Sequence, residues 1–214
     1  MTHILNILRS GGLVMIPLGL LSLVALAIVL ERFWRLRSGN FMKPAVVSTL
    51  RELLVGGHFK QAVTYCKSNP GPFSDLVATL VENRFAPYDE LKQIMEDTAR
   101  HRLYGLQRGL GALGTIVAGA PLLGLLGTVI GMIKIFSVVA SAGSQVTEAL
   151  SLGISEALIT TASGLIIAIP ALFAHSFLES RAGGIITDME TQLIDLLHFV
   201  RRSEGKTEDE EEAA

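Results

Sequence analysis

Three long runs without a charged residue constrain this chain more than any other feature. They comprise 21 residues between Arg9 and Glu31, 25 between Arg108 and Lys134, and 18 between Glu156 and His175. At about 1.5 Å per residue, a helix of each length crosses a hydrocarbon core of roughly 30 Å. With 50% hydrophobic and 18% charged residues, the 214-residue chain is also too apolar for an ordinary soluble domain. The sequence therefore predicts an all-α integral membrane protein with three transmembrane helices.

The first uncharged run has an alternative interpretation. Its segment Ala25-Leu26-Ala27 resembles a small-x-small cleavage site, which is typical of a secretory signal peptide. The run is long for that role, and its strongest charges follow it, as Arg32, Arg35 and Arg37. This arrangement favours an uncleaved anchor with its N-terminus outside.

The distribution of basic residues predicts the orientation of the other segments. Residues 32–108 carry 12 Lys and Arg residues, whereas the connector 135–148 carries none. Cytoplasmic segments of membrane proteins are enriched in Lys and Arg, so the long loop is predicted to be cytoplasmic and the connector to lie outside. The third span then returns the basic C-terminal segment to the cytoplasm.

These assignments predict a division of the chain into eight parts. They are an outer N-terminus (1–9), which is periplasmic in a bacterial inner membrane, transmembrane helix 1 (10–31), a cytoplasmic helical domain (32–108), transmembrane helix 2 (109–134), an outer, likewise periplasmic, connector (135–148), transmembrane helix 3 (149–175), a cytoplasmic helix (176–203) and a disordered acidic tail (204–214).

Apolar residues at helical spacing indicate where helices break or continue in the cytoplasmic part. The loop contains helical patterns that Asn69-Pro70-Gly71-Pro72 interrupts and that Pro87 weakens. From about Tyr88 the helical pattern runs without a strong breaker into span two, and a similar pattern follows span three. Both spans are therefore predicted to extend into the cytoplasm as long helices.

Charge, cysteine content and motifs argue against several functional classes. The formal net charge of −2 does not fit a basic nucleic-acid-binding protein. The single cysteine, Cys66, can form neither an internal disulfide nor a thiolate zinc cage. The hydrolytic and nucleotide-binding motifs HExxH, GxxxxGK[ST] and GxSxG are absent from the sequence. We therefore expect a protein that is not an enzyme and that needs no cofactor or metal.

Small residues form stripes at helical spacing on spans two and three. On span two the stripe contains Gly124, Thr128 and Gly131, and on span three it contains Gly153, Ala157, Thr161, Gly164, Ala168 and Ala171. Such residues let helices approach closely in lipid, where apolar attraction between helices is absent. The stripes can serve helix packing, line a narrow lumen, or do both.

Two prolines lie within the same spans. Pro121 and Pro170 each remove a backbone donor and free a carbonyl one turn earlier. A freed carbonyl in a membrane needs a partner or water. The prolines are interpreted either as packing kinks or as hinges beside a hydrated path.

Neutral hydroxyls and one carboxylate are the polar candidates at depth. Thr128, Thr160, Thr161 and Ser163 either bond back to their own helix or face a cavity that holds water or relays a proton. At about 100° per residue, Thr160 and Thr161 cannot both point at the same lumen. Glu156 is either an intramembrane functional carboxylate or a helix-start residue favoured by the N-terminal dipole.

Two segments closely resemble the signature stretches of the ExbB/TolQ/MotA proton-channel family. They are Ala120-Pro-Leu-Leu-Gly-Leu-Leu-Gly-Thr-Val-Ile-Gly-Met132 and Gly153-Ile-Ser-Glu-Ala-Leu-Ile-Thr-Thr-Ala-Ser-Gly-Leu-Ile-Ile-Ala-Ile-Pro-Ala171. The resemblance covers spans two and three almost without gaps. The three-span layout with a large first cytoplasmic loop looks like ExbB and TolQ rather than four-span MotA.

The resemblance implies an assembly and a set of partners. It implies a homopentameric ring in the bacterial inner membrane around a dimer of an ExbD/TolR-like single-pass protein, which carries the central proton-binding aspartate. A TonB-like or TolA-like transducer then delivers the work to the outer membrane or envelope. The translocated ion is expected to be a proton, with sodium as the alternative, because hydroxyl-lined sites suit both.

The resemblance also implies roles for individual residues. Thr128 and Thr161 match the family's pathway threonines, Glu156 its span-three glutamate, and Pro121 and Pro170 its two prolines. Thr160 is then expected at a subunit contact. The competing hypotheses are a passive membrane scaffold, whose small residues only pack helices, and a permease subunit of an ATP-driven transporter.

Overall fold

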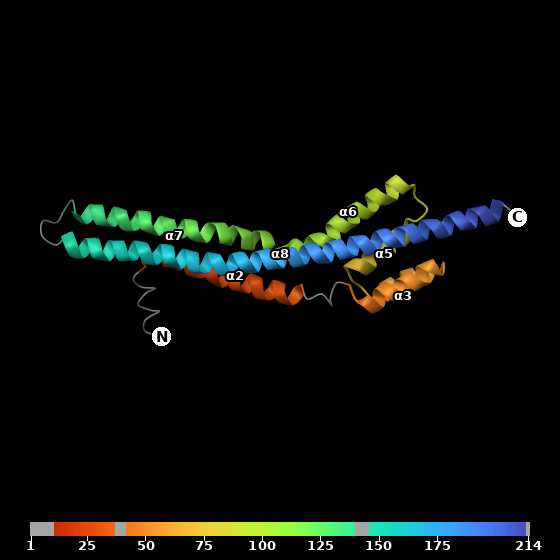
Figure 1. Ribbon diagram of the computed structural model, residues 1–214, viewed down its shortest axis with the longest axis horizontal. Coiled ribbons are helices and arrows are strands. Elements are labelled where there is room, and N and C mark those ends of the chain that lie inside the picture. Colours follow the sequence, from red (N-terminus) through yellow and green to blue (C-terminus); the bar gives the residue numbers. More distant parts are fainter. Residues whose placement is uncertain (1–10, 37–41, 140–145, 213–214) are drawn as a thin grey trace. The chain divides into compact units, whose positions relative to one another are not determined.

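The computed structural model describes residues 11–36, 42–139 and 146–212, and within these ranges its regular secondary structure is α-helical (Figure 1). The helices are α2 (Met15–Arg35), α3 (Pro44–Val55), α4 (Phe59–Ser68), α5 (Pro72–Glu82), α6 (Tyr88–Gln107), α7 (Leu110–Val139) and α8 (Val146–Glu212). The predicted all-α class is therefore confirmed.

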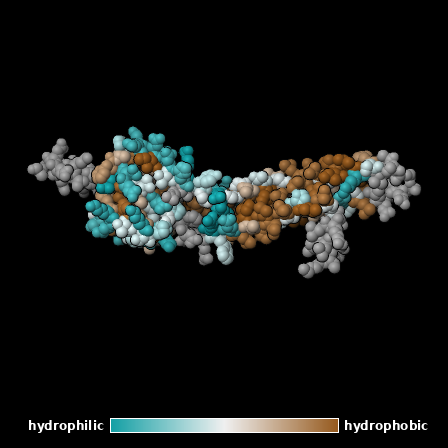
Figure 2. All heavy atoms as spheres, turned by 180° about the vertical axis from the view of Figure 1, so that it is seen from behind, coloured by the Kyte–Doolittle hydropathy of each residue, from teal (hydrophilic) through white to brown (hydrophobic). Residues whose placement is uncertain are grey.

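Among the described residues, three helices are long and apolar enough to cross a membrane. The spanning candidates are Met15–Arg35, Leu110–Ser137 and part of α8 within Leu150–Arg201. They contain most of the three uncharged runs. Large apolar side chains cover much of their surface (Figure 2), for example Leu122 at 65% exposure and Phe173 at 70%. Exposed apolar surface on this scale fits contact with lipid or with other membrane helices.

The chain forms two compact units. Unit 1 contains Met1–Trp34 and Gly109–Leu178, and unit 2 contains Arg35–Arg108 and Glu179–Ala214. Helix α8 contributes to both, which confirms that the helix of the third span continues well beyond the apolar run.

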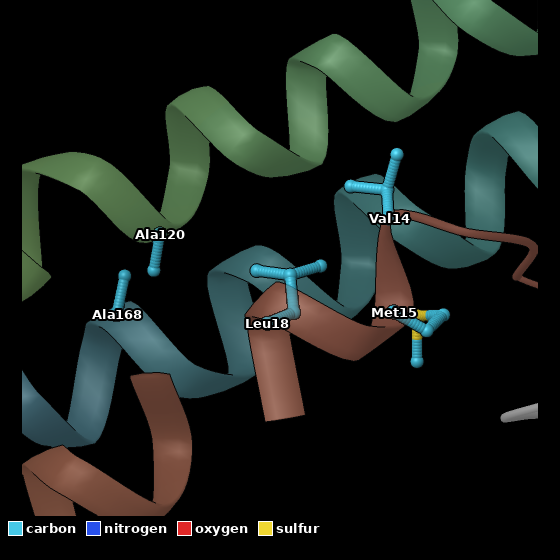
Figure 3. Packing of buried hydrophobic residues seen from close by; sticks show 5 residues of the cluster. All are labelled: Val14, Met15, Leu18, Ala120 and Ala168. Atoms are coloured by element: carbon cyan, nitrogen blue, oxygen red, sulfur yellow. The ribbon is translucent and has the colours of Figure 1, made fainter. Parts of the chain in front are cut away.

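The core of unit 1 lies where α2 meets α7 and α8. Leu18 of α2 is fully buried together with Ala120 of α7, and Ala168 of α8 is 5% exposed (Figure 3). Val14 and Met15 extend this cluster at the start of α2. The small alanines admit close helix packing, and the larger side chains of α2 cover them.

Unit 2 is a helical domain with its own hydrophobic core. Helix α5 buries Phe73, Leu76, Val77 and Leu80, and α8 contributes Met189, Leu196 and Val200. The carboxylate of Asp195 on α8 lies 3.5 Å from the guanidinium of Arg51 on α3. The predicted breaks are confirmed, because α4 ends at Ser68 before the Asn69–Pro72 segment and α6 begins after Pro87.

The prediction that one helix runs from Tyr88 into span two is wrong. Helix α6 ends at Gln107 and α7 begins at Leu110, because Gly109 has a φ of +88°, outside the right-handed helical region. A Cβ at Gly109 would also lie 3.1 Å from Nε of Arg32. Glycine is therefore favoured at this break both by its conformation and by the neighbouring guanidinium.

The tail predicted to be disordered, 204–214, falls largely within the range of α8, which ends at Glu212. Its disorder stays a prediction. The predicted segment 1–9, much of the connector and residues 213–214 lie outside the described residues.

Candidate functional site

Helices α7 and α8 meet along a seam of small residues. A Cβ at Gly164 would lie 2.6 Å from the backbone oxygen of Ala120, and a Cβ at Gly131 would lie 3.0 Å from that of Gly153. A Cβ at Gly124 would lie 3.0 Å from the backbone oxygen of Thr160. Ala157 lies against Gly131, and Ala168 belongs to the unit 1 core. Within the chain, these residues pack the two helices together.

Sequence reasoning missed Gly127 as a member of this seam. A Cβ at Gly127 would lie 2.3 Å from the hydroxyl oxygen of Thr160, so the threonine side chain fills the space that glycine leaves. The predicted stripe placed Thr128 in line with Gly124 and Gly131. The spacing of Ala120, Gly124, Gly127 and Gly131, which is four, three and four, was the signal for the seam.

The hydroxyls of the spans differ in their partners. Thr128 donates to the carbonyl of Leu125 at 2.6 Å, and Ser163 donates to that of Ile159 at 2.8 Å, so both bond back to their own helix. Thr161 instead donates across the seam to the carbonyl of Gly124 at 3.2 Å. Gly124 lies one turn before Thr128 on α7. The two threonines that the sequence assigned to the pathway therefore lie near the same stretch of α7.

The expected place of Thr160 at a subunit contact is wrong. Its side chain is fully buried within the chain, and its hydroxyl donates to the carbonyl of Ala157 at 2.8 Å. The two adjacent threonines do point in different directions, but Gly127 provides the space that encloses Thr160 inside the helix pair. Thr128 and Thr161 are partly exposed in the single chain and remain accessible to another molecule.

Glu156 forms an ion pair with Lys134. Its Oε1 lies 2.5 Å from Nζ of Lys134 on α7, and the glutamate side chain is 20% exposed. Helix α8 begins at Val146, ten residues earlier, so Glu156 lies beyond the first turn where the helix dipole acts. The helix-start interpretation of Glu156 is therefore wrong. Lys134 thus has a specific partner on α8.

Both prolines lie inside continuous helices. Helix α7 continues through Pro121 and α8 through Pro170, so neither residue ends its helix. Pro121 follows Ala120, whose carbonyl contacts the Gly164 position across the seam. Their role as hinges stays a prediction.

These features define a class of protein before any relative is considered. The structure has helices suited to a membrane, a close glycine seam, partly exposed hydroxyls beside it and an ion pair between the same helices. Among the residues that the structure describes, no three His, Cys, Asp or Glu side chains group as metal ligands would. This is the architecture of a helical membrane protein with a polar site between its spans.

Comparison with known proteins identifies the family. Residues 72–191 match the MotA/TolQ/ExbB proton channel family. An ExbB-like biopolymer transport protein 1 of Synechocystis is 35% identical, over 83% of this chain and 71% of the relative. ExbB-like protein 3 of the same organism is 32% identical, over 95% of this chain and 98% of its own length. The ExbB of Xanthomonas campestris is 40% identical over 44% of this chain and 37% of its own length.

The chain therefore belongs to the MotA/TolQ/ExbB proton channel family, which is a channel family and not an enzyme family. The matched region includes α7 and the first part of α8, and with them Thr128, Glu156 and Thr161. The family resemblance seen in the sequence of the spans is confirmed.

Proposed function

We propose that this protein is the channel and stator subunit of a proton-driven motor in the bacterial inner membrane. Its N-terminus faces the periplasm and its C-terminus the cytoplasm, as the distribution of Lys and Arg predicts. Five copies surround a dimer of an ExbD/TolR-like single-pass protein. The ring supplies the wall of the ion path, and the partner supplies the carboxylate that carries the proton.

The observation that carries this proposal is the position of the two hydroxyls. Thr161 donates to the carbonyl of Gly124, one turn from Thr128, and both threonines are partly exposed. A hydroxyl both donates and accepts hydrogen bonds, so it can hold water or pass a proton. A partner helix beside this part of α7 would bring a carboxylate within reach of both threonines.

The membrane potential supplies the energy for movement. Each charge that crosses the membrane releases about 2.3 kcal/mol per 100 mV. That energy is sufficient to bias a rotation or shift between two otherwise balanced positions of the partner dimer. A TonB-like or TolA-like transducer passes the movement on, either to energised outer-membrane transport or to envelope maintenance. The channel residues are common to both systems, so the partners decide between them.

The direct test is proton uptake into liposomes. The chain is reconstituted with its co-purified single-pass partner under an imposed potential, and a pH-sensitive dye reports uptake. Thr161→Val removes the hydroxyl but keeps the side-chain size, and we expect uptake to fall about tenfold, the effect of roughly 1.4 kcal/mol on a rate. Thr160→Val is the matched control, because this adjacent hydroxyl is enclosed in the helix pair and bonds within α8.

Three outcomes would contradict the proposal in whole or in part. Equal uptake by the wild type and Thr161→Val would remove this hydroxyl from the path. Absence of partner-dependent uptake with either protons or sodium would favour a passive scaffold, which the close α7–α8 seam alone also supports. Uptake of sodium in place of protons would identify a sodium-driven version of the same stator.

A further inference from the structure

The ion pair between Lys134 and Glu156 lies beside a close approach of α7 and α8. Gly131, one turn before Lys134, contacts the backbone of Gly153 and the Cβ of Ala157. These contacts hold the helices near enough for Nζ of Lys134 and Oε1 of Glu156 to lie 2.5 Å apart. The seam therefore positions the pair.

The segment that leads into the first span also lies against the carboxylate of Glu156. Gly12, which precedes α2, has a φ of +66°, and a Cβ there would collide with Oε1 of Glu156. The backbone oxygen of Gly12 accepts a hydrogen bond from the N–H of Met15 at 3.2 Å, which leads the chain into α2. The same carboxylate oxygen thus meets both Gly12 and the ammonium of Lys134.

An ionised carboxylate among membrane helices is costly unless a positive charge lies beside it. That charge can be a side chain of the protein or a cation from solution, and hard cations such as sodium prefer oxygen ligands. The Glu156 side chain is only 20% exposed, and the ammonium of Lys134 already contacts the oxygen. A free cation would have to displace a charge that is covalently part of the same chain.

We propose that Lys134 is a tethered counter-ion that occupies the cation position of Glu156 and thereby excludes metal cations from it. Lys134 is in this way a specificity-determining residue: with it, Glu156 is neutralised internally, and without it, Glu156 becomes a site for a monovalent cation such as sodium. The consequence for ion selectivity rests on the proposed channel function, whereas the occupancy of the site by Lys134 does not.

The test measures sodium binding by stability, which requires no transport. The full-length protein is purified in detergent, and its thermal unfolding is followed while NaCl replaces choline chloride at constant total salt. The wild type is expected to show no saturable shift of Tm with sodium. Lys134→Met should show a saturable rise of about 2–4 °C once sodium reaches a few times its Kd.

Two control variants identify the site. Lys134→Arg keeps a positive charge and should behave as the wild type does. Lys134→Met combined with Glu156→Gln lacks the carboxylate and should lose the sodium-dependent rise. Absence of a saturable rise in Lys134→Met would overturn the proposal, as would an equal rise in the double variant.

If Lys134→Met does not fold, the wild type still provides a test. A saturable sodium effect in the wild type that Glu156→Gln abolishes would show that the position is open to sodium despite Lys134, and this would overturn the proposal. Lys134→Gln offers a second neutral replacement. The readout is Tm and does not depend on transport. If sodium binds only when Lys134 is replaced and the wild type conducts no ions, the channel proposal is refuted and the counter-ion proposal stands.

Discussion

Thr160 and Thr161 are adjacent threonines with different partners. Thr160 is enclosed against Gly127 and bonds within its own helix, whereas Thr161 bonds across the seam to Gly124. One residue corresponds to about 100° of rotation on a helix, so neighbours of the same type meet different surroundings. At the scale of single residues, the bonding partner of a hydroxyl therefore depends on which side of α8 it occupies.

Cys66 is predicted to be unreactive in the folded protein. Burial raises the pKa of its thiol from 9.0 to about 11, and the negative charges of Asp75 and Glu82 add to this effect. Because the thiolate is the reactive form, labelling at pH 8 should be about 100-fold slower in the folded protein than in the unfolded chain. The rate in the folded protein should increase with pH up to about 11.

The same shift predicts a loss of stability in alkali. Between pH 9 and about 11 the thiol loses its proton in the unfolded chain but keeps it in the folded protein. The stability that the neutral thiol gives the folded state is therefore complete below pH 9 and is lost as the pH rises through about 11. Labelling kinetics with a thiol reagent check the predicted low reactivity of Cys66. Cys66→Ser is the blank, because the chain has no other cysteine. Equal labelling rates in the folded and unfolded protein at pH 8 would contradict it.

At the scale of elements, the α7–α8 seam is the decisive contact of unit 1. Membrane helices associate through close packing rather than through a hydrophobic driving force. Replacing a seam glycine with a larger residue therefore pushes the two helices apart and reduces their contact. The seam also explains why Gly164 and Ala168, assigned to either a lumen or a packing face, lie between helices of one chain. Within the chain, both residues therefore contact a neighbouring helix.

Gly164→Ala should destabilise this helix pair. The added Cβ would lie 2.6 Å from the backbone oxygen of Ala120, so α7 and α8 must move apart at a cost of about 1–3 kcal/mol. Thermal unfolding in detergent measures the effect as a lower Tm. Gly119→Ala is the matched control, because its Cβ would meet no atom within 4 Å. A Tm reduced equally by both substitutions would argue against the seam.

At the scale of the whole molecule, the apolar and polar residues divide between two units. The three apolar spans give unit 1 its lipid-compatible surface, and the shorter helices α3 to α5 give unit 2 an ordinary buried core. This division, together with the placement of Lys and Arg, underlies the predicted orientation in the membrane.

The orientation predicts which cysteine replacements an impermeant thiol reagent can reach. In a Cys66→Ser background, Ser144→Cys in the connector should be labelled in intact spheroplasts. Ser48→Cys, at an exposed position of α3, should be labelled only after the membrane is permeabilised. Labelling of Ser48→Cys before permeabilisation, without labelling of Ser144→Cys, would indicate the reverse orientation.

The sequence by itself determined the helical class, the three apolar spans, the breaks around Asn69–Pro72 and the family, because these depend on local composition and on recognisable motifs. Only the tertiary structure decided that Gly127 encloses Thr160, that Thr161 bonds to Gly124, and that Lys134 pairs with Glu156. The physical reason is that helical spacing shows which residues share a face of one helix. The rotation and register of the neighbouring helix decide which atoms that face meets.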